Sequence, residues 1–128
     1  MEATGEISRI GYREEVEAVM RTEDMSGISL LGLQDFPGQG TALVGMINSH
    51  MQSKPYDFAK PERFASFFRA QLPLAALPKY TYVSGEILEA EVRIANYGKT
   101  DMTGPVGYCM EGGKVRKCGE LPAVICPA

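Results

Sequence analysis

The apolar positions in the first half of the chain predict a helix, a strand and two further helices. Residues 8–22 place apolar side chains on one stripe and charged side chains on the opposite face, which is typical of an amphipathic helix. The stripe consists of Tyr12, Val16, Val19 and Met20, and the polar face of Arg13, Glu14, Glu17 and Arg21. Residues 28–33 show almost no polar and apolar alternation, which predicts a parallel strand covered on both faces. Thr41 can cap a helix over 41–51, and Pro61 can open a short third helix.

From Tyr80 onward the pattern changes to that of strands. Glu89, Glu91 and Arg93 separate four residues that we expect to face inward from a half-buried antiparallel strand: Leu88, Ala90, Val92 and Ile94. Gly112-Gly113 indicates a hairpin turn between strands over 106–110 and 114–118. The sequence therefore predicts an α+β chain with two regions, 1–76 and 77–128, separated near Pro73 and Pro78.

A polar, glycine-rich corner follows the strand expected at 28–33. Gly38-Gln39-Gly40 is similar to a phosphate-binding loop, but residue 43 is Leu where a dinucleotide fingerprint has its third glycine, and no Lys-Ser/Thr pair follows. A plain turn is therefore favoured. Gln34 and Asp35 can either face a sugar, whose hydroxyls suit carboxamide and carboxylate groups, or cap the next helix and fix the turn.

Three ordered motifs resemble the β-galactosidase-like branch of glycoside hydrolase family two. Residues 30–45, LLGLQDFPGQGTALVG, resemble the eighth barrel strand and the turn after it. Residues 2–5 and 11–22 resemble the seventh barrel helix, while 77–82 and 90–98 resemble the entry into the following β-sandwich. The resemblance extends to about Leu121. It implies that residues 1–76 are a remnant of the C-terminal part of a (β/α)₈ barrel, arranged helix-strand-helix-helix, and that 77–128 form an incomplete antiparallel Ig-like β-sandwich.

The same resemblance implies a retaining exo-β-glycosidase as the parent enzyme, with carbohydrate as its partner. Such enzymes use two glutamates about 5 Å apart, which the family carries on the fourth and seventh barrel strands, and both strands would precede Met1. A complete barrel needs about 250 residues, whereas this chain has 128. No glutamate here is therefore assigned as catalytic, and no cofactor is expected. The candidate substrate-binding residues are Gln34, Asp35 and Phe36.

Composition narrows the classes of partner. The net charge is −3 and the 13 basic residues are scattered, which argues against a nucleic-acid surface. No apolar run approaches the length of a membrane span, and the acidic N-terminus does not resemble a signal peptide. From the sequence as written we expect a soluble, cytoplasmic chain. A segment upstream of Met1 could carry a targeting signal, so the sequence does not assign the compartment.

The cysteines and aromatic residues offer weaker candidates. The chain has three cysteines, Cys109, Cys118 and Cys126, and an odd number cannot pair fully within the chain. A two-residue turn at Gly112-Gly113 would place Arg116, not Cys118, opposite Cys109. We therefore expect free thiols and a reducing compartment. A zinc site is disfavoured because the cysteines form no CxxC element. A catalytic pair between His50 and a cysteine is disfavoured because no third group that could orient the pair is identified. Some aromatic residues could stack on a sugar, but core packing is favoured by their helical spacing and by the leucines that follow: Phe64, Phe67, Phe68, Tyr80 and Tyr82.

Two functional hypotheses remain open. The chain is either a non-catalytic portion of a family-two-like glycoside hydrolase or a stand-alone module. As a module, it would associate with itself, forming a homodimer, or complement a separate upstream polypeptide through the open edges of the strand expected at 28–33.

Overall fold

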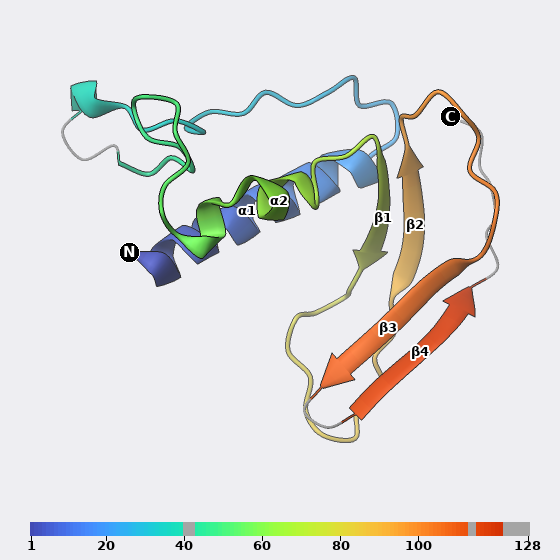
Figure 1. The fold of residues 1–128 in the computed structure, drawn as a ribbon. Helices are drawn as coiled ribbons and strands as arrows, with labels where there is room; N and C mark the ends of the chain where they lie inside the picture. The colour runs from blue at the N-terminus through green and yellow to red at the C-terminus, as the bar shows by residue number, and fades with distance from the viewer. Residues whose placement is uncertain (40–42, 113–114, 122–128) are drawn as a thin grey trace. The chain divides into compact units, whose positions relative to one another are not determined.

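A computed structural model describes residues 1–39, 43–112 and 115–121 of the protein. Its elements are α1 (Glu2–Arg21), η1 (Pro37–Gln39), η2 (Asp57–Ala59), α2 (Pro61–Ala65), β1 (Gln71–Ala76), β2 (Glu91–Asn96), β3 (Val106–Gly112) and β4 (Val115–Leu121) (Figure 1). Strand β1 pairs with β2 and β3 pairs with β4, giving two antiparallel two-stranded sheets. The predicted α+β class is confirmed. The chain divides into two compact units, 1–95 and 96–128.

The predicted first helix is confirmed and is longer than expected, because it begins at Glu2. Val16 on the apolar stripe is buried, while Glu17 on the polar face pairs with Arg13 and Arg21, one helical turn away in each direction. Near its start, the helix lies so close to η2 that a side-chain carbon at Gly5 would overlap the ring of Phe58. Glycine at this position therefore permits the packing of the helix against η2.

Two small hydrophobic clusters form the core of the first unit, and both touch α1. Met46, Phe58 and Ala59 make the first cluster, with Tyr12, Tyr56 and Phe64 packed around them. Leu72, Leu74 and Ala95 make the second, covered by Met20. One face of the helix thus anchors the loop region through Tyr12 and the β1–β2 sheet through Met20.

The short helix α2 begins at Pro61 as predicted, and it lies beside α1 (Figure 1). Arg63 of α2 donates two hydrogen bonds to Glu6 of α1, at 2.8 and 3.0 Å. Of the three phenylalanines expected on its buried side, Phe67 is buried and Phe64 is half-buried, whereas Phe68 is 46% exposed. The expectation for Phe68 is wrong: because the helix ends at Ala65, residues 67 and 68 no longer follow helical spacing, and only the first of them is buried.

The strand expected at 28–33 and the helix expected at 41–51 are both wrong. Residues 28–33 have no regular secondary structure, and Gln34 makes a single parallel bridge to Ile47. Residues 41 and 42 lie outside the described residues, and none of residues 43–51 is helical. The side chain of Asn48 accepts the backbone N–H groups of His50 and Gln52, which turns the chain where a helix would have continued.

In the sheets, the predicted inward face of the strand is also wrong. Strand β2 runs over 91–96, Leu88 lies outside it and Val92 is 39% exposed; the buried residue is Ala95. Ala95 packs against Leu72 and Leu74 of β1, and this contact, not the alternation of polar residues, determines which end of β2 is covered. The predicted inward face implied that an aspartate at position 92 would be buried. Because Val92 reaches solvent, Val92→Asp would instead leave the carboxylate in contact with water.

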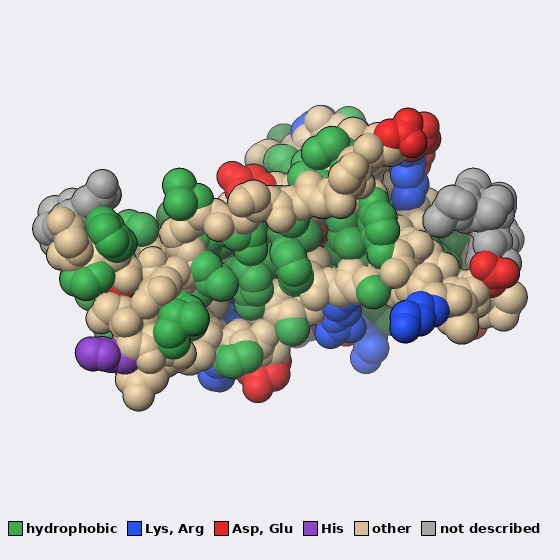
Figure 2. All heavy atoms as spheres, turned by 90° about the horizontal axis from the view of Figure 1, so that it is seen from above, with side chains coloured by type: hydrophobic (Ala, Val, Ile, Leu, Met, Phe, Trp, Pro, Cys, Tyr) green, Lys and Arg blue, Asp and Glu red, His purple; other side chains and the backbone are tan. Residues whose placement is uncertain are grey.

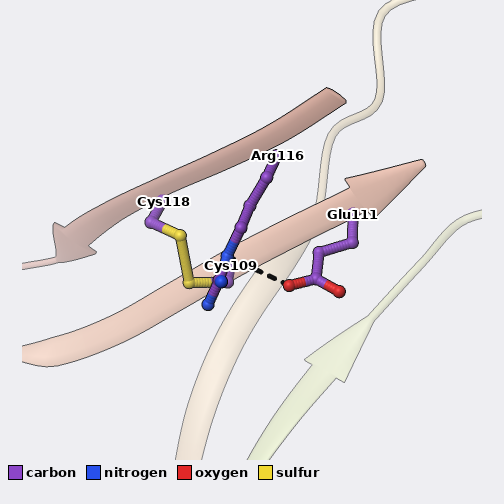
Figure 3. The surroundings of a disulfide bond; sticks show 4 residues. All are labelled: Cys109, Glu111, Arg116 and Cys118. Atoms are coloured by element: carbon purple, nitrogen blue, oxygen red, sulfur yellow. Dashed lines mark ion pairs between the residues drawn. A yellow bond between two sulfur atoms is a disulfide. The ribbon is translucent and has the colours of Figure 1, made fainter. Parts of the chain in front are cut away.

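The hairpin expected around residue 112 is confirmed, but its register is not the predicted one. Gly112 pairs with Val115, so Cys109 lies directly opposite Cys118 and the two form a disulfide (Figure 3). The turn itself, at 113–114, lies outside the described residues, as does Cys126. The prediction of free thiols is wrong for Cys109 and Cys118, because moving the turn by one residue replaces Arg116 with Cys118 as the partner of Cys109. The argument for a reducing compartment loses its basis.

Candidate functional site

The candidate residues Gln34, Asp35 and Phe36 belong to a loop that we call the Asp35 loop, residues 33–39 and 43–54. Its first and last parts are joined through the backbone, because Asp35 donates its N–H to Ile47 at 2.9 Å and Ile47 donates its own to Leu33 at 3.1 Å. These two bonds flank the bridge between Gln34 and Ile47. The candidate residues are therefore held in place by a segment ten or more residues further along the chain.

The carboxylate of Asp35 is the centre of this loop. The Asp35 side chain is 7% exposed, and its Oδ1 accepts hydrogen bonds from the backbone N of Gly45 and from Nζ of Lys54, each at 2.8 Å. Lys54 is 13% exposed and donates a further bond to the carbonyl of Leu43 at 3.0 Å. A buried carboxylate with a cation and a backbone donor as partners is electrostatically compensated, and its bonds hold three parts of the loop together.

Gly45 lies against the backbone of residues 33–35. A side-chain carbon at this position would come within 2.8 Å of the carbonyl oxygen of Leu33 and still closer to the backbone of Gln34 and Asp35. Backbone atoms cannot move aside as the end of a flexible side chain can. The residue at 45 must therefore be glycine for its N–H to reach the Asp35 carboxylate.

The other two candidate residues point to different partners. Gln34 donates its side-chain amide to the carbonyl of Ser49 at 2.9 Å, and so fixes the far turn of the loop. Phe36 is 59% exposed and lies over Gly38. Gln34 and Asp35 thus have the turn-fixing contacts that the sequence left as one of two alternatives, whereas Phe36 is open to solvent.

A separate apolar hollow of about 290 Å³ lies between the loop and α2. Ser53 is its only polar lining residue; the others are Leu33, Met46, Ile47, Ala59, Pro61, Phe64, Ala65 and Phe68. None of the three candidate residues lines it. A sugar needs several hydrogen-bonding groups, and a wall with one hydroxyl offers too few. The hollow suits an apolar side chain better than a carbohydrate.

The segment before the loop exposes large apolar side chains. Leu31 is 95% exposed, and Ile28 and Leu33 are each 36% exposed. Leu43 and Val44, on the other side of the residues that are not described, are 62% and 64% exposed. Figure 2 shows hydrophobic side chains reaching the surface on the face that it presents. The hydroxyl of Tyr12 donates to the carbonyl of Leu31 at 3.1 Å, and burial raises the pKa of that hydroxyl, so it remains a donor at neutral pH.

Sequence reasoning missed Lys54, Asn48 and the special position of Gly45. Lys54 lies 19 residues from Asp35, and no short motif connects the two. Asn48 had a usable signal, since asparagine is the residue that most often turns a chain through its own side chain. Among the described residues, no group of three or more histidine, cysteine, aspartate or glutamate side chains is placed to hold a metal ion.

Comparison of the chain with protein-family models, curated protein sequences and solved structures gave no match. The described part of the chain has no helix long and apolar enough to cross a membrane.

Proposed function

We propose that this chain is the non-catalytic C-terminal portion of a family-two-like glycoside hydrolase whose parent hydrolyses terminal β-glycosides. The observation that carries the proposal is the extended apolar segment 28–33, which lies uncovered beside a loop that is firmly held. An almost fully exposed leucine in an apolar run indicates a surface that another chain segment covers. In the proposed parent, the missing strands and helices of the barrel provide that cover.

In this proposal the role of the chain is structural. Asp35, Lys54 and Gly45 fix the corner after segment 28–33, so that this segment is presented with a defined end. Backbone groups of the segment then complete the barrel by pairing with strands from the upstream part. The nucleophile and the proton donor come from that upstream part, and the residues described here would bound the sugar site only through the exposed side of the corner, where Phe36 lies.

The DNA upstream of Met1 provides the first test, since the proposal requires an open reading frame for the rest of the barrel. The decisive experiment joins that polypeptide to this chain and measures hydrolysis of aryl β-galactosides. We compare Leu31→Asp with Ile87→Asp, because both residues are exposed in the isolated chain, at 95% and 81%. Only Leu31→Asp should lower the activity and the thermal midpoint of the joined protein. Equal activity and stability of the two variants would contradict the proposal.

A self-associating module is the second candidate, and the same exposed residues favour it. The original reason, an open-edged strand at 28–33, no longer holds, but the side chains of Leu31, Leu43 and Val44 are each more than half exposed, and a second copy can cover them. Sedimentation equilibrium of the isolated chain at micromolar concentration tests this. A dimer that Leu31→Asp dissociates and Ile87→Asp leaves intact would support self-association, and a monomer at all concentrations would exclude it.

A further inference from the structure

The disulfide between Cys109 and Cys118 is accessible from solvent. Both residues are exposed, and they are direct partners in the register of β3 and β4. Tyr108 of β3 pairs with Gly119 of β4, and its ring lies over that glycine. A side-chain carbon at position 119 would overlap the tyrosine ring. Neighbouring positions on a strand face opposite sides of the sheet. Tyr108 therefore covers the side of the hairpin opposite the disulfide and leaves the sulfur atoms uncovered.

The charges around the two sulfur atoms are unequal. Arg116 and Glu111 lie on the same face of the hairpin as the disulfide and form an ion pair, with 3.0 Å between Nε and Oε1 (Figure 3). On this face Cys109 has Glu111 two residues away along its strand, whereas Cys118 has Arg116 two residues before it and Glu120 two residues after it, so that a cation offsets the carboxylate only at Cys118. A nearby cation stabilises a thiolate and a nearby carboxylate opposes it. A thiolate is thus better accommodated at Cys118 than at Cys109.

We propose that the Cys109–Cys118 disulfide is a site of thiol–disulfide exchange with small solvent thiols of the glutathione class. In the first step, the thiolate of the small thiol attacks Sγ of Cys109, and a bond forms between these two sulfurs. The Cys109–Cys118 bond breaks, and its electron pair leaves with Sγ of Cys118, which then takes a proton from solvent. In the second step, another small thiolate attacks the sulfur of the bound thiol and releases Cys109. Two small thiols are oxidised to their disulfide, and the protein disulfide is reduced to two thiols.

The hairpin itself depends on this bond. A two-stranded sheet is marginally stable in water, and in β3 every residue after Val106 is exposed. The disulfide closes a short loop between directly paired residues, which restricts the unfolded hairpin far more than the folded one. Exchange at this site therefore converts an ordered hairpin into a looser one, and the second unit of the chain becomes sensitive to the thiol concentration around it. This inference is independent of the glycoside hydrolase proposal.

The test uses the full chain with Cys126→Ser, so that no third thiol takes part. The air-oxidised protein is incubated with reduced glutathione without denaturant, free thiols are blocked with an alkylating agent at intervals, and the products are mapped by mass spectrometry. We expect a glutathione adduct on Cys109, followed by loss of the protein disulfide. A disulfide that glutathione reduces only in denaturant, or an adduct found chiefly on Cys118, would overturn the proposal.

Two variants test the role of the charges. Arg116→Gln should slow the first step about two- to five-fold, the range expected for one nearby surface charge. Arg93→Gln is the matched control, because Arg93 also forms an exposed strand ion pair, with Glu91 at 2.7 Å, but belongs to a different sheet. Equal rates for the two variants would refute the assignment of Cys118 as the leaving thiolate. Hydrogen exchange of residues 106–112 and 115–121 should accelerate on reduction, and unchanged exchange would refute the coupling to hairpin order.

Discussion

Replacing Asp35 by asparagine is the sharpest test of how the loop is held. Asparagine keeps an oxygen that can accept the N–H of Gly45 but removes the charge that pairs with Lys54. Removing one partner of a fully buried ion pair costs about 3–5 kcal/mol. Because Lys54 keeps the carbonyl of Leu43 as a partner and is 13% exposed, we expect a smaller loss, about 2–3 kcal/mol.

Asp35→Ala separates the two roles of the side chain. It removes the charge and also leaves the buried N–H of Gly45 without its acceptor, which should cost about 1–2 kcal/mol more than Asp35→Asn. The double variant Asp35→Asn with Lys54→Met should recover part of the loss, since no uncompensated charge then remains in the loop. The order of stability expected is wild type, then the double variant, then Asp35→Asn, then Asp35→Ala.

Urea unfolding followed by circular dichroism measures these differences. With a dependence of about 1–3 kcal/mol per molar urea, a loss of about 2–3 kcal/mol for Asp35→Asn should lower the midpoint by about 0.7–3 M. Glu91→Gln is the control, because Glu91 belongs to an ion pair whose side chains are 61% and 50% exposed, and such pairs contribute at most about 1 kcal/mol. If Asp35→Asn and Glu91→Gln unfold at the same urea concentration, the Asp35–Lys54 pair does not hold the loop.

Three further predictions follow from the same structure. The isolated chain should not hydrolyse aryl β-galactosides, β-glucuronides or β-mannosides, and turnover that survives removal of host enzymes would disprove the fragment interpretation. In α1, Gly11→Ala should stabilise the chain by about 0.5–1 kcal/mol, whereas Gly5→Ala should destabilise it because of Phe58; thermal midpoints that move the same way would contradict this packing. The pKa of Glu14 is lowered, first by the hydrogen bond from Tyr80 and then by Arg13, so this contact stabilises the chain above pH about 4.5 and is lost as the pH falls through the lowered pKa. Tyr80→Phe should therefore flatten the decline of the thermal midpoint as the pH falls below about 4.5, and an unchanged decline would count against the contact.

The sequence allowed correct prediction where local signals and packing agree. The stripe from Tyr12 to Met20 has helical spacing over several turns, and the structure uses the same residues to cover both hydrophobic clusters. Pro61 marks the start of α2, because its fixed backbone angle suits the first turn of a helix. The glycines near residue 112 indicate a hairpin, although a shift of one residue in the turn was enough to misplace every cross-strand partner.

The remaining errors have a common physical origin in contacts between distant residues. Segment 28–33 has the composition of a buried strand, but strand structure needs a continuous ladder, and among the described residues it is followed by one parallel bridge, from Gln34 to Ile47. Strand β1 was missed because Pro73 argues against a strand; Pro73 is exposed there while Leu72 and Leu74 point to the core. In each case the residues that determine the structure of the segment lie many positions away in the sequence. Local periodicity and residue propensity carry no information about such contacts.

This contrast bears directly on the proposed function. The Asp35 loop is internally satisfied: its buried carboxylate, its close-packed glycine and its asparagine turn all find partners within residues 33–54. The segment immediately before it, residues 28–33, is the opposite: it has strand-like composition, its carbonyls of Leu31 and Leu33 accept bonds from Tyr12 and Ile47, and the Leu31 side chain lies in water. Ile28, Leu31 and Leu33 are exposed within six residues, and a run of exposed apolar side chains is typical of a surface that another chain segment covers. A firmly held corner next to an uncovered apolar segment is better explained as one side of an interface, and the Leu31→Asp and Ile87→Asp comparison tests this explanation.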